Sequence, residues 1–462
     1  MKKLVIIGGI AIIALGVILG YAGCRNVSTN LPAKVTLDYW GVWDESKDLT
    51  QIIDNYTKLH PHVSIAYRKF RAEEYEDALV KAWALGEGPD LFQIHNTWMG
   101  HYIDEEYIAP APKETKAVYV NTTKNMFNQI EQTATQETVP FYTLDEFRQQ
   151  FVDVVVQDAV WFNAKQKQAI YGLPLSVDTL AMYYNEDLLN RANIAFPPST
   201  WQEFLDVLPR LVVRDTDGAI LQAGAAIGGT SANVENAQDI LALLMMQNGT
   251  TMLSENNRTV QFTTKNASNQ SLGELALTFY TDFANPSKTV YTWSVDQPNA
   301  LELFTQGKIA FFFGYSYHLS RLSGTGGSEI FHAAPIPQID TNSSFKVTFA
   351  NYWMNVVFSN TPHANDAWNF LQFATSNKQS KYYIVSSRRP PARRDLIAEV
   401  QGDPELKVFV DQLIPSRSWY RGKNPEAAEQ FFDDMIANVV SGQTTPAIAL
   451  QQAAQQIQLT LQ

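Results

Sequence analysis

The chain has 462 residues, a formal net charge of -12, a single cysteine and a hydrophobic fraction of 45%. The negative charge excludes nucleic acid as an expected partner, because neutralising phosphates requires clustered lysine and arginine. The length permits two or three average domains, and one cysteine cannot form an internal disulfide. Stability must therefore come from a large hydrophobic core.

The first residues have the layout of an export signal. Met1-Lys2-Lys3 precedes an uncharged apolar stretch from Leu4 to Ala22, so residues 1–23 are expected to be a signal peptide. Ala22-Gly23-Cys24 resembles the lipobox of bacterial lipoproteins, in which the cysteine is lipidated, although Tyr21 replaces the usual leucine. The alternative is an uncleaved anchor helix, since about 19 apolar residues can cross a bilayer. Both alternatives place the protein at the outer face of the cytoplasmic membrane.

Strand and helix patterns alternate from Val35 onward. Strands are expected at 35–40, 63–67 and 91–94, with amphipathic helices between them. This order predicts right-handed crossovers and a mainly parallel sheet, which binds ligands beyond the carboxyl ends of its strands. The loops 41–45 and 95–98 leave those ends and are candidate site segments.

Further elements follow along the chain. Residues 110–139 are polar and rich in Thr and Gln, which indicates a surface insertion. Thr200-x-x-Glu203 is a capping box and predicts the start of a helix. Asp215-x-Asp-Gly218 predicts a turn, because the remaining ligands of a calcium loop are missing. Additional segments are expected as a strand at 171–175, helices at 240–246 and 272–283, a strand at 309–313 and a helical end at 425–461.

A longer pattern carries a family resemblance. The run from Gly172 to Asn185 reads GLPLSVDTLAMYYN, and Pro197-Pro198-x-Thr200-Trp201 follows it. This order resembles the signature of sugar-type extracellular solute-binding proteins of ABC importers. Gly88-Pro89-Asp90-Leu91 and Gly307-Lys308-Ile309-Ala310 fit the same family, so the resemblance covers nearly all of the chain after Val35.

The resemblance implies a periplasmic-binding-protein-like fold of two α/β lobes with the ligand in the cleft between them. The first lobe is expected to comprise 34–177 and 351–386, and the second 178–350 and 387–462. Hinge crossovers are expected at 175–180, 349–356 and 386–389. The implied ligand is a sugar or short oligosaccharide and the implied partner is a membrane permease, with a monomeric protein and no cofactor.

Candidate ligand-binding residues come from strand ends and crossovers. In such proteins aromatic rings stack on sugar faces while carboxylates, amides and guanidinium groups bond hydroxyls. For each candidate a purely structural role is the alternative, and Arg389 is the alternative to Arg388. The candidates are Trp43, Asp44, Asn96, Trp98, Asp178, Tyr315, Tyr317, Asn351, Tyr352, Trp353 and Arg388.

Other functions stay open at this point. A secreted glycoside hydrolase needs two carboxylates facing one cleft, and 47 Asp and Glu residues do not exclude such a pair. A sensor, or a protein for another small solute, would keep the same fold. The histidines show no zinc spacing and the chain has no Walker motif, so we expect no metal, no catalytic residue and no ATPase activity.

Overall fold

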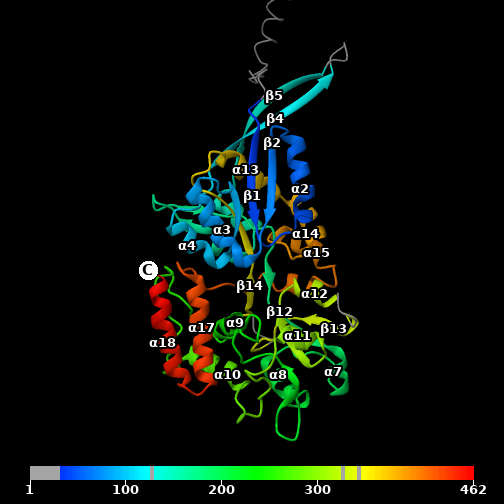
Figure 1. Cartoon of the computed structure of the whole chain (residues 1–462). Helices are drawn as coiled ribbons and strands as arrows, with labels where there is room; N and C mark the ends of the chain where they lie inside the picture. The colour runs from blue at the N-terminus through cyan, green and yellow to red at the C-terminus, as the bar shows by residue number, and fades with distance from the viewer. Residues whose placement is uncertain (1–31, 125–129, 324–327, 341–344, 462) are drawn as a thin grey trace, which may run out of the picture.

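The computed structural model describes residues 32–124, 130–323, 328–340 and 345–461. Figure 1 shows two lobes arranged along the long axis of the molecule. The predictions for residues 1–23 and for Cys24 lie outside the described residues. Within the described ranges, no helix combines the length and the apolar character needed to cross a membrane.

A four-stranded sheet forms the centre of the first lobe, in the order β15-β3-β1-β2. β1 is parallel to β2 and to β3, while β15 is antiparallel to β3. The predicted parallel pairing of the first three strands is confirmed, so Gly41 and His95 end neighbouring strands at one edge of the sheet. The strands are β1 (Val35–Gly41), β2 (Val63–Lys69), β3 (Leu91–His95) and β15 (Trp353–Val357).

Helices cover this sheet and bury its apolar side chains. Leu37, Leu49, Ile52 and Leu91 are fully buried between them. A short hairpin of β6 (Val160–Phe162) and β7 (Gln168–Ile170) adds to the lobe, and the strand expected at 171–175 is an irregular extended segment instead. The helices are α2 (Ser46–Leu59), α3 (Ala72–Leu85), α4 (Met99–Asp104), α5 (Leu144–Gln150), α6 (Asp153–Ala159), α13 (Ala364–Ala374), α14 (Asn377–Ser387) and α15 (Ile397–Val400).

The expected insertion forms a two-stranded antiparallel ribbon. β4 (Glu114–Lys124) and β5 (Ile130–Pro140) pair along their whole length. At the base of the ribbon, the backbone N–H of Lys116 donates to Asn365 Oδ1 at 2.7 Å, and Asn365 Nδ2 donates to the Lys116 carbonyl at 2.8 Å. The ribbon extends from the end of the first lobe that is remote from the second lobe (Figure 1).

A five-stranded mixed sheet forms the centre of the second lobe, in the order β10-β11-β12-β9-β13. The capping box is confirmed, since Thr200 Oγ1 accepts the backbone N–H of Glu203 at 3.1 Å. The strands are β9 (Ala181–Asn185), β10 (Val213–Arg214), β11 (Ile220–Ala225), β12 (Ile309–Gly314) and β13 (Phe331–Ala334). The helices are α7 (Glu186–Arg191), α8 (Trp201–Val207), α9 (Ala237–Gln247), α10 (Leu272–Asp282), α11 (Ala300–Thr305), α12 (His318–Ser323), α17 (Pro425–Val440) and α18 (Pro446–Thr460).

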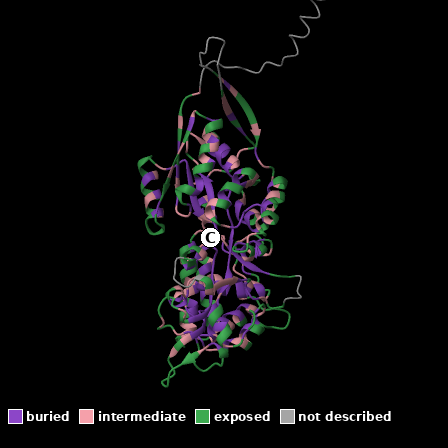
Figure 2. Ribbon diagram, turned by 90° about the vertical axis from the view of Figure 1, so that its right-hand side faces the viewer, coloured by how far each residue is buried: buried purple, intermediate pink, exposed green. Residues whose placement is uncertain are grey.

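Each lobe has its own hydrophobic core, and buried residues fill both lobes in Figure 2. Three short strands join the lobes: β8 (Asp178–Thr179), β14 (Thr348–Asn351) and β16 (Ser416–Arg417), in the order β16-β14-β8. Phe349 packs in the second core and Ala350 in the first. β14 therefore passes from one lobe to the other within two consecutive residues.

The third connection lies later in the chain than the expected crossover at 386–389. Ile384 and Ala392, on either side of that segment, both pack in the first core, and so does Leu413. Phe409 within this segment already packs in the second core, and the chain stays with that core from Tyr420 onward, after β16. The segment from 387 to Leu413, which also holds α16 (Lys407–Asp411), thus lies largely against the first lobe, although we expected it in the second.

The side chain of Asp158 anchors this third connection to the first lobe. Its carboxylate is 2% exposed and accepts hydrogen bonds from Ser418 Oγ at 2.7 Å and from Arg421 Nη2 at 2.5 Å. Tyr352 Oη, at 2.8 Å, and Asn96 Nδ2, at 3.0 Å, donate to the same carboxylate. One buried acid thereby holds three separate segments of the chain together.

We predict that Asp158→Ala lowers the free energy of unfolding by about 3 to 5 kcal/mol, because it leaves a largely buried Arg421 without its partner. Urea unfolding of the chain from about Asn30 onward measures this change. Lys423→Ala is the control, since the ammonium of Lys423 forms an exposed ion pair with Asp104 at 2.7 Å, and its loss should cost less than about 1 kcal/mol. Equal effects of the two variants would contradict the role of Asp158.

Candidate functional site

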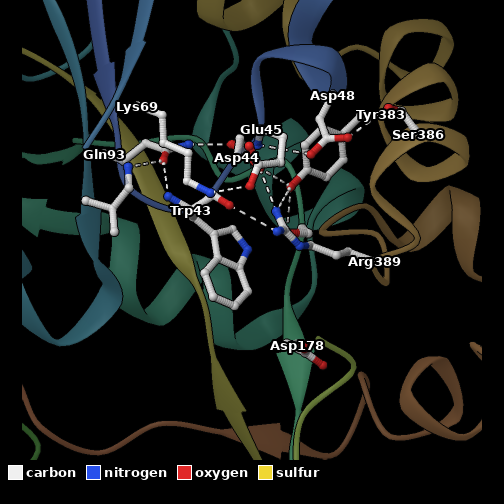
Figure 3. A network of polar contacts seen from close by, with 12 residues as sticks. Trp43, Asp44, Glu45, Asp48, Lys69, Gln93, Asp178, Tyr383, Ser386 and Arg389 are labelled. Atoms are coloured by element: carbon white, nitrogen blue, oxygen red, sulfur yellow. Dashed lines mark hydrogen bonds and ion pairs between the residues drawn. The ribbon is translucent and has the colours of Figure 1, made fainter. Parts of the chain in front are cut away.

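Asp44 is at the centre of a polar network at the end of β1, which Figure 3 shows. Its side chain is 2% exposed and pairs with Arg389 Nη1 at 2.7 Å. Tyr383 Oη donates to it at 2.6 Å, and Gln93 Nε2 donates from the neighbouring strand β3. Burial raises the pKa of Asp44, although Arg389 and these two donors oppose that rise. All of its partners belong to the first lobe, so the carboxylate is fully engaged without a ligand.

Trp43 lies between this network and the second lobe. The guanidinium of Arg389 lies over the indole ring at 4.3 Å, and Arg389 Nη2 donates to the Trp43 carbonyl at 3.0 Å. Across the junction, the ring of Tyr317 meets the indole edge-to-face, with 5.3 Å between centroids and an interplanar angle of 89°. A cation over an indole face stabilises its position, so Arg389 holds Trp43 toward the second lobe.

Asp178 lies on the first connection and contacts the turn that follows β12. Its carboxylate is 4% exposed and accepts the backbone N–H of Ser316 at 2.9 Å and Ser316 Oγ at 2.6 Å. The backbone N–H of Thr179 donates to it at 2.9 Å. Burial raises the pKa of Asp178 to about 6 against these hydrogen bonds.

Tyr315 begins a chain of hydrogen bonds that reaches from the second lobe to the first. Its ring is 1% exposed and its Oη donates to Asp239 Oδ2 at 2.5 Å. Asn351 Nδ2 donates to the same oxygen at 3.4 Å, and Asn351 Oδ1 lies 2.9 Å from His95 Nε2. Burial raises the pKa of Asp239 to about 6 and lowers the pKa of His95.

Aromatic rings contact both ends of this chain of hydrogen bonds. Trp353 lies 5.7 Å from His95 and 5.9 Å from Trp98, centroid to centroid, and Tyr315 stacks on Tyr317 at 6.1 Å. Together these contacts form one continuous row across the junction, which we call the interlobe band. The band consists of Trp98, Trp353, His95, Asn351, Asp239, Tyr315, Tyr317 and Trp43.

A pocket of about 510 Å³ opens between the lobes beside Tyr317. Ser316, Ser320 and Phe331 line it from the second lobe, and Ser387, Arg388 and Arg389 line it from the segment packed on the first. Its volume is in the range of small-molecule sites. Both aromatic and hydroxyl groups therefore face this space.

The structure brings five of the sequence candidates to partly exposed positions on the interlobe band: Trp43, Trp98, Tyr317, Asn351 and Trp353. Five others are buried and bonded to protein groups: Asp44, Asn96, Asp178, Tyr315 and Tyr352. Arg388 belongs to neither group, since it is exposed, has a φ of 54° and pairs with Asp403 and Glu405, but it lines the pocket beside Tyr317. Its neighbour Arg389, rather than Arg388, lies over the indole ring of Trp43.

The sequence prediction missed Asp239 and Gln93. Asp239 lies within the helix α9, where an acid at that position looks like an ordinary polar residue of the helix surface. Gln93 stands inside the buried strand β3 and is 1% exposed. A polar residue inside a buried strand needs partners, and this is the one local signal that could have identified Gln93.

Comparison with known proteins agrees with the two-lobed architecture. The model of the family described as bacterial extracellular solute-binding protein matches residues 43–381, so the chain belongs to this family. A putative binding protein of Brucella abortus (strain 2308) is 24% identical over 51% of this chain and 53% of its own length. A maltotriose-binding protein of Pyrococcus abyssi is 22% identical over 36% of this chain and 28% of its own length. The chain thus spans about half the length, or less, of these curated relatives.

Solved structures resemble the whole fold. The cyclic alpha-maltosyl-1,6-maltose binding protein from Arthrobacter globiformis has a TM-score of 0.71 at 16% identity, covering 93% of this chain and 99% of its own. The sugar-binding protein of Xanthomonas citri has a TM-score of 0.69 at 18% identity, covering 92% of this chain and 97% of its own. At these identities the likeness concerns the fold, and the predicted periplasmic-binding-protein-like architecture is confirmed.

We predict a pH dependence of stability from Asp178. Its pKa in the folded protein, about 6, exceeds the ordinary 3.8, so between these values the folded protein keeps a proton that the unfolded chain has lost. The contribution of Asp178 to the free energy of unfolding should therefore fall by about 3 kcal/mol as pH rises from about 4 to about 6, and stay constant above.

The difference in unfolding free energy between the native protein and Asp178→Asn, measured by urea titration from about pH 4 to pH 7, isolates this term. Asp54→Asn, at an exposed position of α2, controls for the change in net charge. A difference that does not change with pH would contradict the raised pKa.

Proposed function

We propose that this protein is the extracellular substrate-binding subunit of an ABC importer, and that it captures a sugar or short oligosaccharide between its lobes for delivery to a membrane permease. The observation that carries the proposal is the interlobe band, in which Trp43 and Trp98 of the first lobe and Tyr317 of the second face one junction. Aromatic rings beside hydrogen-bonding groups suit the apolar faces and hydroxyl edges of pyranose rings.

The charges at the junction support a ligand without net negative charge. Asp239 lies on the band and, among the residues that the structure describes, forms no ion pair. Two cations at the junction, Arg389 and Arg421, are paired with Asp44 and Asp158, and a third, Arg321, lies 5.5 Å over the ring of Tyr317. An anionic solute would meet the carboxylate of Asp239 on the band, whereas neutral hydroxyls can donate to it.

The ligand would be enclosed by a hinge motion of the two lobes about the strands β8, β14 and β16. In this proposal Trp43, Trp98, Tyr317, Asn351 and Trp353 touch the ligand, while the buried candidates hold them in position. Closure removes water, so each buried hydroxyl of the ligand without a partner costs about 1 to 3 kcal/mol. Selectivity then follows from matching hydrogen bonds.

The proposal extends to the location of the protein and to the absence of catalysis. Family membership supports an extracellular binding role, and a lipid on Cys24 or an N-terminal helix would tether the protein at the outer face of the membrane. We propose that the bound saccharide is returned unchanged. Product analysis after incubation with oligosaccharides distinguishes this from a glycoside hydrolase, which would shorten them.

We predict that sugars stabilise the soluble part of the chain, from about Asn30 onward. A ligand at 100 times its dissociation constant adds about 2.7 kcal/mol to the free energy of unfolding. A thermal-shift screen against saccharides, polyols, amino acids and short peptides measures this gain. Stabilisation by amino acids or peptides alone would keep the fold and refute the ligand class.

We predict that Trp43→Ala and Tyr317→Ala each weaken saccharide binding by about tenfold or more, because each removes one stacking ring worth at least about 1.4 kcal/mol. Isothermal titration calorimetry with the best saccharide of the screen gives the affinities. Phe196→Ala is the matched control, since its ring is 81% exposed in the second lobe and lies outside the band. Unchanged affinity in both ring variants would refute the proposed site.

A further inference from the structure

Asp178 was expected to contact the ligand, and its surroundings indicate a different task. We propose that Asp178 is a positioning residue, which holds the turn after β12 and thereby the ring of Tyr317 toward Trp43, without touching the ligand. This inference rests on the proposed function, because it assigns Tyr317 to the ligand site. Under this inference Tyr317 contacts the ligand, and Asp178 affects the binding affinity only through the position of Tyr317.

Both oxygens of the Asp178 carboxylate are already occupied. Oδ1 accepts the backbone N–H groups of Thr179 and Ser316, at 2.9 and 3.0 Å. Oδ2 accepts the same Ser316 N–H at 2.9 Å and Ser316 Oγ at 2.6 Å. The side chain is 4% exposed, so a ligand hydroxyl has neither room nor a free acceptor there. Figure 3 shows Asp178 below the ring of Trp43, apart from the Asp44 network.

The turn that Asp178 holds is fixed from within the second lobe as well. Tyr183 Oη donates to the Tyr315 carbonyl at 2.7 Å, and the Tyr315 N–H donates to His318 Nδ1 at 3.0 Å. A Cβ at Gly314 would come within 2.7 Å of that same nitrogen. Side chains of the second lobe therefore hold the turn from inside that lobe. Asp178 holds it by hydrogen bonds from the junction.

Tyr317 follows the bonded residue Ser316 directly. Its ring lies 4.1 Å from His318 on one side and 5.3 Å from Trp43 of the first lobe. A shift of the Ser316 amide would displace this ring, because Tyr317 is the next residue in the chain. The backbone of Asp178 also pairs with Asn351 in the junction sheet, so this one residue links the turn to two of the connections between the lobes.

Asp178→Asn tests this role, because it nearly preserves the volume but replaces one acceptor oxygen with a donor. Hydrogen–deuterium exchange of the soluble protein, without any ligand, reads out the Ser316 amide. We expect exchange in the peptide 314–319 to become about tenfold faster in the variant, with little change elsewhere. Asp90→Asn is the matched control, since Asp90 is also a buried acid that accepts a backbone N–H, from Asp38 at 2.9 Å, and a hydroxyl, from Thr361.

Binding then distinguishes positioning from direct contact. With a saccharide from the screen, Asp178→Asn should weaken binding by about tenfold in the native background and cause no further loss when Tyr317→Ala is already present. A full additional loss in the Tyr317→Ala background would show that Asp178 touches the ligand, and would overturn the inference. Unchanged exchange at 314–319 would overturn it independently. If no saccharide binds the native protein, the proposed function fails, and the exchange result still decides whether Asp178 holds the turn.

Discussion

Asp44, Asp158 and Asp178 are carboxylates buried where the lobes meet, and the rest of the junction is arranged around them. A carboxylate removed from water must be matched by cations or hydrogen-bond donors, otherwise folding becomes unfavourable. Asp44 is matched by Arg389, Asp158 by Arg421, and Asp178 by the amide and hydroxyl of Ser316. Because these donors come from distant parts of the chain, each buried acid fixes the path of one segment at the junction.

This arrangement separates the residues that hold the site from those that face it. Asp44 and Arg389 fix Trp43 from behind, and Asp178 fixes the turn that carries Tyr317. The rings themselves are partly exposed and meet across the junction at 5.3 Å. Because buried residues fix each ring within its own lobe, each half of the site can be rigid while the lobes move relative to each other. A hinged binding protein requires this combination.

Local patterns in the sequence were sufficient for the architecture but not for the pairing of distant groups. The alternating strands and helices, the capping box and the long motif from Gly172 to Asn185 predicted the parallel sheet and the two lobes, because these signals depend on neighbouring residues. The ion pair between Asp44 and Arg389 joins residues 345 positions apart, and no local spacing reveals it. The ribbon at 114–140 was recognised only as an insertion, since strands polar on both faces carry little apolar periodicity. The segment 386–389, which the resemblance predicts as a crossover, stays with the first lobe because Arg389 pairs with Asp44 there.

The central claim is that a saccharide is held between the two lobes and draws them together. Its most direct test is the distance between spin labels at Leu85→Cys of the first lobe and Leu459→Cys of the second, at side chains 73% and 72% exposed. Labelling is specific because Cys24, the only native cysteine, is absent from the soluble part of the chain. Saccharide at saturating concentration should shift the distances to one narrow, shorter distribution. The same distribution with and without a saccharide that binds would contradict capture between the lobes.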